Sequence, residues 1–404
     1  NKRELSVSFF SIYAFQIFAC LVSMAAYICL VALTNQEYKF IAYIQALSVI
    51  ACAVNVNWFL FGLEEFAVVT IRNIFVKIAE VASILLLVKT ESDLAIYILI
   101  MLGSTLLSNL IAFVLLKKYV SLVRISWQDI KKHIKPNLML FFPLLAVSVY
   151  HIMDKTMLGA MSTYVESGYY YNSDKLINIP LCVINGVGVV MLPRVSNMIA
   201  SGKHEEVLNL LKTSLEMIVA VGVAMSVGIA SISNEFVPFF FGSGFDKCIF
   251  LTYVFAPILL IKGVVSTVRM QYLIPYGRDR EFLYSVCIGA VANLVLNLIF
   301  IPKYAALGAV IGTLGAEAIA CITQLYNIKK EFDLRSYLAE SMVYVVLGIV
   351  LFASVRSCAL INVITPVKII IEITVGGLVY GALTFIYWYY KRRDYLSYFF
   401  PKFF

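Results

Sequence analysis

Between Asp93 and Lys117 the chain reads LAIYILIMLGSTLLSNLIAFVLL, a run that contains no charged residue. An α-helix needs roughly 20 mostly apolar residues to cross the hydrocarbon core of a bilayer, so this run is long enough to span one. Its apolar residues do not alternate with polar ones, as they do in the strands of a transmembrane barrel. The run therefore predicts one membrane-spanning helix.

Runs of the same kind recur along the whole chain. The other uncharged runs lie between Glu4 and Glu37, Lys39 and Glu64, Lys135 and Asp154, Lys175 and Arg194, Glu216 and Glu235, Glu281 and Lys303, Glu340 and Arg356, and Glu372 and Lys391. Three further runs, near residues 68–88, 248–272 and 304–326, are apolar but carry internal charges. We therefore expect an all-α polytopic membrane protein with about twelve transmembrane helices.

The composition supports this prediction and narrows the function. Hydrophobic residues make up 61% of the chain and charged residues 14%, and the mean hydropathy is +0.89. A soluble domain would expose much of this apolar surface to water, whereas lipid accommodates it. The longest connection is residues 117–137, and the sequence contains neither a glycine-rich nucleotide loop nor a cluster of metal ligands. We therefore expect no enzyme, no metal site and no cofactor.

Lys and Arg are distributed unevenly among the connections. They are frequent in 117–137, 194–212, 273–281, 327–335 and the C-terminal tail, and rare in 34–39, 162–173 and 302–304. Because cytoplasmic loops carry an excess of Lys and Arg, we predict that both ends of the chain are cytoplasmic. The net charge of +8 follows from these juxtamembrane residues and does not indicate a nucleic-acid partner.

Several predicted spans carry ionisable residues at helical spacing. They are Arg72, Lys77 and Glu80 in the third span, His151, Asp154 and Lys155 in the fifth, Lys262 and Arg269 with Ser266 in the eighth, and Glu317, alone, in the tenth. A charge at bilayer depth costs at least a few kcal/mol, so each needs a partner or a water-filled cavity. Pro143, Pro180 and Pro257 lie inside spans and allow them to bend. Together these residues predict a partly cationic cavity lined by bent helices, as transporters build near the middle of the membrane.

Purely structural roles stay open for several of these residues. Ion pairs of Asp154 with Lys155, or of Lys77 with Glu80, would only hold helices together, and Lys77 and Lys262 can extend to the membrane surface. We expect two other sets of residues to join helices closely: the amides Asn293 and Asn297, and the glycine pairs Gly308/Gly312 and Gly377/Gly381.

Several phrases of the sequence resemble those of a known family. They are DKTMLG at 154–159, MLPRVS at 191–196, QYLIPYGR at 271–278, NLVLN at 293–297 leading into IPKY at 301–304, FFFG at 239–242, and WFLFGLE at 58–64. In combination they resemble the polysaccharide repeat-unit flippases of the multidrug/oligosaccharidyl-lipid/polysaccharide exporter superfamily, from the first residues to about residue 335. Two helices that the family has before Asn1 are missing from this sequence, and Tyr276 stands where a smaller residue is expected.

The resemblance implies a two-bundle, multidrug-and-toxin-extrusion-like exporter fold that lacks its first two helices. We predict that residues 1–116 form the remainder of the N-terminal bundle, with four helices, and that 117–137 form a basic cytoplasmic linker. Residues 138–326 would form the C-terminal six-helix bundle, and 327–404 two additional helices and a basic cytoplasmic tail.

The resemblance also implies a substrate and a mechanism. The family carries undecaprenyl-diphosphate-linked oligosaccharides across the bacterial plasma membrane by alternating access, for capsule, O-antigen or other surface polysaccharide, coupled to a cation gradient or the membrane potential. Its partners would be membrane lipids, a polysaccharide polymerase and glycosyltransferases. A diphosphate needs cations inside the membrane, and the candidates are Arg269, Lys262, Lys155, Arg72 and Lys77. The candidates for coupling are Asp154, His151, Glu80 and Glu317.

Other functions remain open on the sequence alone. A flippase for a lipid-linked peptidoglycan precursor would also have to carry a lipid diphosphate across the membrane. A cation-coupled multidrug exporter would share the fold but would need a negatively charged cavity. A membrane glycosyltransferase or polymerase would need a large catalytic loop, and a structural scaffold would not need the charged stripes.

Overall fold

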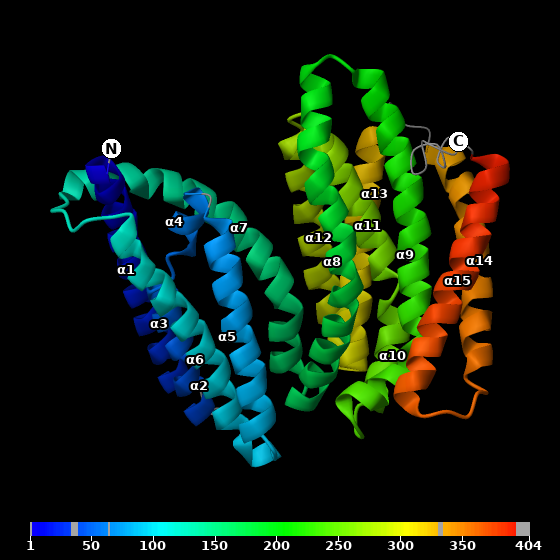
Figure 1. The fold of residues 1–404 in the computed structure, drawn as a ribbon, viewed down its shortest axis with the longest axis horizontal. Coiled ribbons are helices and arrows are strands. Elements are labelled where there is room, and N and C mark those ends of the chain that lie inside the picture. The colour runs from blue at the N-terminus through cyan, green and yellow to red at the C-terminus, as the bar shows by residue number, and fades with distance from the viewer. Residues whose placement is uncertain (1, 34–38, 64, 330–333, 393–404) are drawn as a thin grey trace. The chain divides into compact units, whose positions relative to one another are not determined.

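The computed structural model describes residues 2–33, 39–63, 65–329 and 334–392 (Figure 1). The side chains of some helical residues, His151 among them, lie outside the described part. The chain divides into two compact units, Asn1–Leu145 and Ala146–Phe404, and the division falls within one long helix. Each unit is described by itself below. The predicted division at 117–137 stays a prediction.

The first unit is built from helices with an aromatic and aliphatic core. They are α1 (Lys2–Leu33), α2 (Lys39–Gln45), α3 (Leu47–Ala53), α4 (Asn57–Gly62), α5 (Phe66–Leu87), α6 (Leu94–Leu115) and the first part of α7 (Trp127–Met161). The short 3-10 turns η1 (Glu91–Asp93) and η2 (Leu116–Lys118) flank α6. Phe9 stacks on Trp58 and meets Phe59 edge to face, which joins α1 to α4.

A capped 3-10 turn precedes the quoted run from 94, because Thr90 and Asp93 form a capping box across η1. Asp93 accepts hydrogen bonds from the backbone N–H groups of Lys89 and Thr90, both at 2.9 Å. These donors hold the pKa of the Asp93 carboxyl below its ordinary value. The charged residue that bounds the run is therefore also the residue from which α6 starts.

The predicted span between Lys39 and Glu64 differs from expectation, because it is not one helix but α2, α3 and α4 in series. The break between α3 and α4 leaves backbone carbonyls without helical partners. Gln16 of α1 compensates, since its Nε2 donates to the carbonyls of Cys52 at 2.8 Å and Asn55 at 2.9 Å.

The second unit holds the rest of α7 and the remaining helices (Figure 1). They are α8 (Tyr164–Ala200), α9 (His204–Phe241), α10 (Asp246–Phe255), α11 (Ile258–Val268), the π-helical turn η3 (Arg269–Leu273), α12 (Asp279–Tyr304), α13 (Ala306–Ile328), α14 (Leu334–Cys358) and α15 (Thr365–Lys391). The predicted bend at Pro257 is confirmed, because α10 ends and α11 begins on either side of it.

Helices α12 and α13 pack closely through glycines. A Cβ atom on Gly308 would lie 2.3 Å from the carbonyl oxygen of Phe300, and one on Gly312 would lie 2.0 Å from Oδ1 of Asn297. The predicted close packing at this pair is therefore confirmed. The same prediction of close helix packing is wrong for Gly377 and Gly381 of α15, where an added Cβ would meet no described atom within 4 Å.

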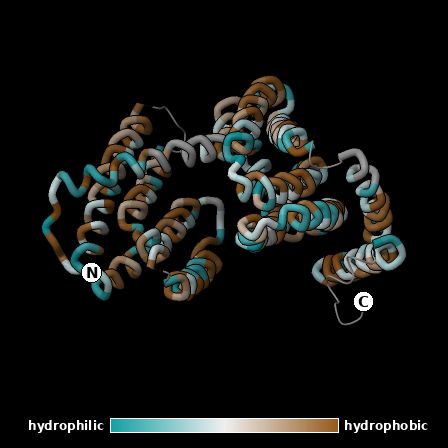
Figure 2. The backbone as a smooth tube through the Cα atoms, turned by 90° about the horizontal axis from the view of Figure 1, so that it is seen from above, coloured by the Kyte–Doolittle hydropathy of each residue, from teal (hydrophilic) through white to brown (hydrophobic). Residues whose placement is uncertain are grey.

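The helices of both units are mainly apolar along their lengths (Figure 2). Within the described residues, ten of the predicted spans form helices, or helices in series, that are long and apolar enough to cross a membrane. The other two predicted spans fall on α5, which carries Arg72, Lys77 and Glu80, and on α7, whose middle side chains are not described. The fold is that of a polytopic helical membrane protein.

Candidate functional site

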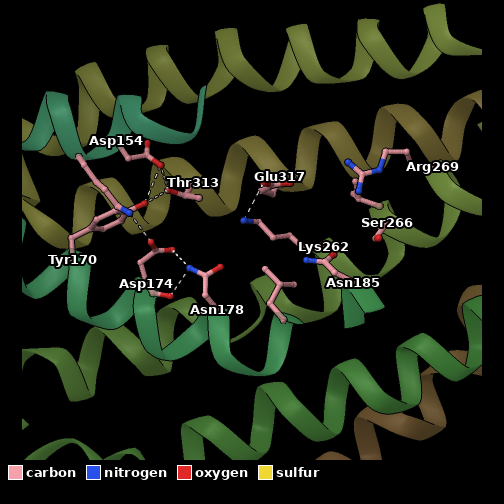
Figure 3. Close-up of a pocket in the computed structure, with 13 residues that line it drawn as sticks. Asp154, Tyr170, Asp174, Asn178, Asn185, Lys262, Ser266, Arg269, Thr313 and Glu317 are labelled. Atoms are coloured by element: carbon pink, nitrogen blue, oxygen red, sulfur yellow. Dashed lines mark hydrogen bonds and ion pairs between the residues drawn. The ribbon is translucent and has the colours of Figure 1, made fainter. Parts of the chain in front are cut away.

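A polar pocket of about 420 Å³ lies inside the second unit, lined by α7, α8, α11, η3 and α13 (Figure 3). Asp154, Tyr170 and Thr313 gather at one end of it. Lys262 and Glu317 lie in the middle, and Arg269 lies at the other end. The structure therefore brings together five residues that the sequence singled out: Asp154, Lys155, Lys262, Arg269 and Glu317.

Asp154 is 5% exposed and is surrounded by four neutral donors. Its Oδ1 accepts from the side-chain amides of Asn293 at 2.8 Å and Asn297 at 2.6 Å. Its Oδ2 accepts from the hydroxyls of Tyr170 at 2.9 Å and Thr313 at 2.8 Å. Charge-assisted hydrogen bonds of this kind stabilise a carboxylate inside a helical bundle without a cation. The prediction that the two asparagines join helices is confirmed, because they link α12 to α7.

The suggested ion pair of Asp154 with Lys155 is wrong. Lys155 turns to α8, where its Nζ lies 3.0 Å from Oδ2 of Asp174 and 4.9 Å from the ring centre of Tyr171. Consecutive helical residues point about 100° apart, so neighbours in sequence do not face each other. Asp174 also accepts from Asn178, one turn further along α8, at 3.0 Å.

Glu317, the lone ionisable residue of the tenth predicted span, pairs with a residue of another helix. Its Oε1 lies 3.6 Å from Nζ of Lys262, and both side chains are largely buried. This distance is longer than a hydrogen bond, so the pair is held by charge attraction and not by a directed donor. Lys262 can therefore exchange Glu317 for another anion without breaking a short contact.

Arg269 begins the π-helical turn η3, in which the N–H of Ile274 bonds back to the Arg269 carbonyl at 3.0 Å. Its Nε is buried and has no hydrogen-bond partner, and the described residues offer the guanidinium no ion pair. The ring of Phe282 lies 5.6 Å from its Cζ. A buried donor without a partner is costly, and π-helical turns often occur at functional sites. Arg269 therefore has a buried hydrogen-bond donor, Nε, that is available to an anion.

The pocket is balanced in formal charge, so the expected excess of positive charge is wrong for the part that the structure describes. Three cations line it together with three acids: Lys155, Lys262 and Arg269 with Asp154, Asp174 and Glu317. What differs is their pairing. The Lys262–Glu317 pair lies in the middle, and the Lys155–Asp174 pair lies at the Asp154 end. Arg269 and Asp154 form no ion pair with a described residue, although Glu317 lies within electrostatic reach of Arg269.

Arg72, Lys77 and Glu80 belong to the first unit. Arg72 is 7% exposed and donates from Nη2 to Asn57 at 2.8 Å and Asn73 at 2.9 Å. Lys77 pairs with Glu80 at 2.6 Å, as the sequence suggested. The pair lies beside a cavity of about 370 Å³ lined by amides and hydroxyls: Asn55, Asn57, Asn73, Val76, Lys77, Glu80, Ser104, Thr105, Ser108 and Asn109.

Sequence reasoning missed several pocket residues. Tyr170, Asp174 and Asn178 come from α8, and Thr313 from α13. The spacing of Tyr170, Asp174 and Asn178 at i, i+4, i+8 was the available signal, because it places all three on one helix face. The side chain of His151, a coupling candidate, lies outside the described residues.

Comparison with known proteins gives the family context. A family model described as "Polysaccharide biosynthesis protein" matches residues 2–199. The chain is 20% identical over 274 residues to a "Putative O-antigen transporter" of Escherichia coli K12, covering 67% of this chain and 66% of that protein. It is 21% identical over 244 residues to a "Probable low-salt glycan biosynthesis flippase Agl15" of Haloferax volcanii, covering 59% and 50%. A third relative, "Lipid II flippase MurJ" of Bacillus subtilis, is 21% identical over 245 residues, covering 56% and 43%.

The fold is similar to a solved structure over nearly the whole chain. A lipid II flippase MurJ in an inward closed conformation superposes with a TM-score of 0.72 at 17% identity, covering 97% of this chain and 84% of that one. The sequence alignments span 43–66% of the curated relatives' own lengths. The similarity is to transporters and flippases and not to enzymes.

Proposed function

We propose, from the match of residues 2–199 to the polysaccharide biosynthesis protein family and from the similarity of the fold to a lipid II flippase, that the chain moves a lipid-linked glycan across a bacterial plasma membrane. The substrate we propose is an undecaprenyl-diphosphate-linked oligosaccharide repeat unit for capsule or another surface polysaccharide. The mechanism we propose is alternating access driven by a cation.

The observation that carries the proposal is the pairing of charges in the pocket. A diphosphate brings negative charge into a poorly hydrated site and needs donors that are not already used. Arg269 offers a guanidinium fork without a charged partner in the described part, and Lys262 is held to Glu317 only at 3.6 Å. Arg binds two phosphate oxygens at once, while Lys adds a point charge. Together, Arg269 and Lys262 form a binding site for one diphosphate.

Asp154 is the proposed coupling residue. Its carboxylate lies beside two hydroxyl oxygens that a proton or a small metal cation prefers, those of Thr313 and Tyr170. A cation bound here would neutralise Asp154 and change the hydrogen bonds that join α7, α8, α12 and α13.

The predicted orientation gives the two ends of the pocket different roles. With residue 127 on the cytoplasmic side, α7 runs outward to Asp154, and α11 returns inward to Arg269. Arg269 would then meet the diphosphate entering from the cytoplasmic leaflet, while Asp154 would meet the coupling cation from outside. The Lys262–Glu317 pair lies between the two ends and the Lys155–Asp174 pair lies at the Asp154 end, and both pairs can exchange partners as the substrate moves.

Reconstitution tests the function directly. The purified chain in proteoliposomes should move a fluorescent polyprenyl-diphosphate-linked disaccharide between leaflets, as measured by loss of protection from a membrane-impermeant quencher. A polyprenyl-linked peptidoglycan precursor should be compared in the same assay, because it has the same diphosphate but a different headgroup, a disaccharide that carries a peptide. Transport of neither lipid, under a proton or a sodium gradient or without one, would overturn the proposal.

A further inference from the structure

A second cavity of the second unit, of about 460 Å³, lies away from the charged pocket and is lined by α8, α9, α14 and α15. Aliphatic side chains make most of its walls, among them Ile179 and Val183 of α8, Ile232 of α9 and Leu351 of α14. Among its described lining residues, only Glu372 of α15 is charged. Pockets of this size bind drug-sized molecules, and their few polar groups set specificity.

Glu372 has no exposed surface, and neither of its carboxyl oxygens has a hydrogen-bond partner in the described structure. The nearby hydroxyl groups are already used. Tyr380 donates to the carbonyl of Ala220 at 2.8 Å, and Ser231 donates to that of Gly228 at 2.9 Å. A carboxyl group buried without a partner opposes folding, so a molecule that supplies the missing partner is bound favourably.

The charged groups nearest to Glu372 form their ion pairs with another acid, although they also lie within electrostatic reach of Glu372. Arg356 of α14 lies 3.1 Å and Lys368 of α15 lies 3.6 Å from the carboxylate of Glu235 in α9. Lys368 also donates to the carbonyl of Ala359 at 2.7 Å. No described residue of α8 that lines the cavity is charged. Among the residues that the structure describes, Glu372 is therefore the only acid that lines the apolar space.

We infer that this cavity binds an amphiphilic organic monocation of the alkylammonium class, with its apolar body between the four helices and its charge on Glu372. A metal ion would need several oxygen ligands, and the described walls offer chiefly aliphatic groups. An uncharged lipid chain would leave the carboxyl without a partner. The site differs from the proposed glycan-lipid site in both place and charge, because a diphosphate is an anion.

Binding of an ammonium ion at Glu372 is coupled to the protonation of its carboxyl group. Where the buried carboxyl carries a proton, an arriving ammonium ion takes the place of that proton. One proton is released to solvent for each ammonium bound, and no covalent bond to carbon forms or breaks. Binding should therefore strengthen as the pH rises.

The test uses decylammonium as the probe and the purified full chain in nanodiscs of zwitterionic lipid. Dicyclohexylcarbodiimide reacts with neutral carboxyl groups in apolar surroundings, and peptide mass spectrometry should find its adduct on Glu372. Decylammonium should slow this labelling at least tenfold, while decanol of the same chain length should have little effect. In a direct titration, Glu372→Gln should bind decylammonium at least tenfold more weakly, and Arg269→Ala should bind it normally.

A second variant tests the contribution of the apolar cavity independently of the Glu372 carboxyl. Gly377 lines the same space, and an added Cβ there would meet no described atom within 4 Å, so Gly377→Leu should fill the cavity and leave Glu372 in place. The variant should lose protection by decylammonium. Equal protection by decanol and decylammonium, or equal affinity of Glu372→Gln and the unmodified chain, would show only insertion into lipid and overturn the inference. Absence of labelling at Glu372 would overturn it as well.

Discussion

Lys155 of α7 pairs with Asp174 of α8 at 3.0 Å, although Asp154 is its immediate neighbour in sequence. The pairing divides the acids of the pocket into two kinds. Asp174 and Glu317 each neutralise a lysine, while Asp154 is held by neutral amides and hydroxyls. We therefore propose Asp154 as the coupling residue and the two ion pairs as groups that exchange partners during the conformational change.

The Lys155–Asp174 pair predicts the outcome of charge exchange. Lys155→Asp alone would place three acids together and should reduce flipping at least tenfold. Lys155→Asp combined with Asp174→Lys restores the pair in reverse and should recover most of the activity in the proteoliposome assay. The matched exchange of Asp154→Lys with Lys155→Asp should recover none. Rescue by that second exchange instead would mean that Asp154 is the functional partner of Lys155.

Asp154→Asn should uncouple transport. An amide has one acceptor oxygen in place of two, so two of the four donors around position 154 would lose their acceptor, at a cost of about 1–3 kcal/mol each. We expect stimulation by an imposed proton or sodium gradient to disappear, while gradient-independent exchange persists at a reduced rate. Asp174→Asn serves as the control, because it removes an acid from the same pocket and should keep the gradient response. An unchanged gradient response in Asp154→Asn would exclude this residue from coupling.

Gly312→Ala should destabilise the second unit. The added Cβ would lie 2.0 Å from Oδ1 of Asn297 and would displace the amide that donates to Asp154. Overpacking of this kind typically costs about 1–3 kcal/mol. The apparent melting temperature of the purified protein should fall for Gly312→Ala and stay constant for Gly381→Ala, where the Cβ meets open space. Equal melting temperatures would show that α12 and α13 can separate at this point.

The predicted orientation can be read by labelling single cysteines. All eight native cysteines must first be replaced, with small residues at the buried Cys248 and Cys358. Leu122, 92% exposed, lies in the basic connection, and Val165, 62% exposed, lies on the opposite side of the predicted membrane. In intact cells, Val165→Cys should react with an impermeant maleimide and Leu122→Cys should not. The reverse pattern would invert the orientation and with it the roles of Arg269 and Asp154.

Much of the fold could be predicted because its signals are local. Apolar runs of sufficient length, the break at Pro257 and the glycine pair on α13 depend on residues that are near each other in sequence. The division of residues 39–62 into three helices could not be predicted from local sequence. The side chain that bonds to the carbonyl groups at the break, Gln16, comes from α1.

The site was predictable as a set of residues but not as a set of contacts. The stripe of Lys262, Ser266 and Arg269 does line one pocket, since helical spacing alone places these residues on one face. The partners of Lys155 and Lys262, in contrast, lie on other helices, and only the packing of α8 and α13 selects them. The formal charge of the pocket could not be predicted for the same reason. Acids on other helices balance the positive charges of Lys262 and Arg269.

The central claim is that Arg269 receives the diphosphate of the substrate. Arg269→Ala removes one charge-assisted contact in a poorly hydrated site, worth about 1.5–3 kcal/mol, or about ten- to a hundredfold in affinity. Arg269→Lys keeps the charge but loses the fork, so its affinity should be intermediate. Arg280→Ala is the matched control, because it removes an exposed arginine near the start of α12, outside the pocket.

The decisive measurement is a titration of the purified proteins with a polyprenyl-diphosphate-linked disaccharide, read by native mass spectrometry. We predict that Arg269→Ala binds it ten- to a hundredfold more weakly than the unmodified chain and Arg280→Ala, about 1.5–3 kcal/mol. Equal affinity of Arg269→Ala and the unmodified chain would contradict the account and remove Arg269 from the substrate site.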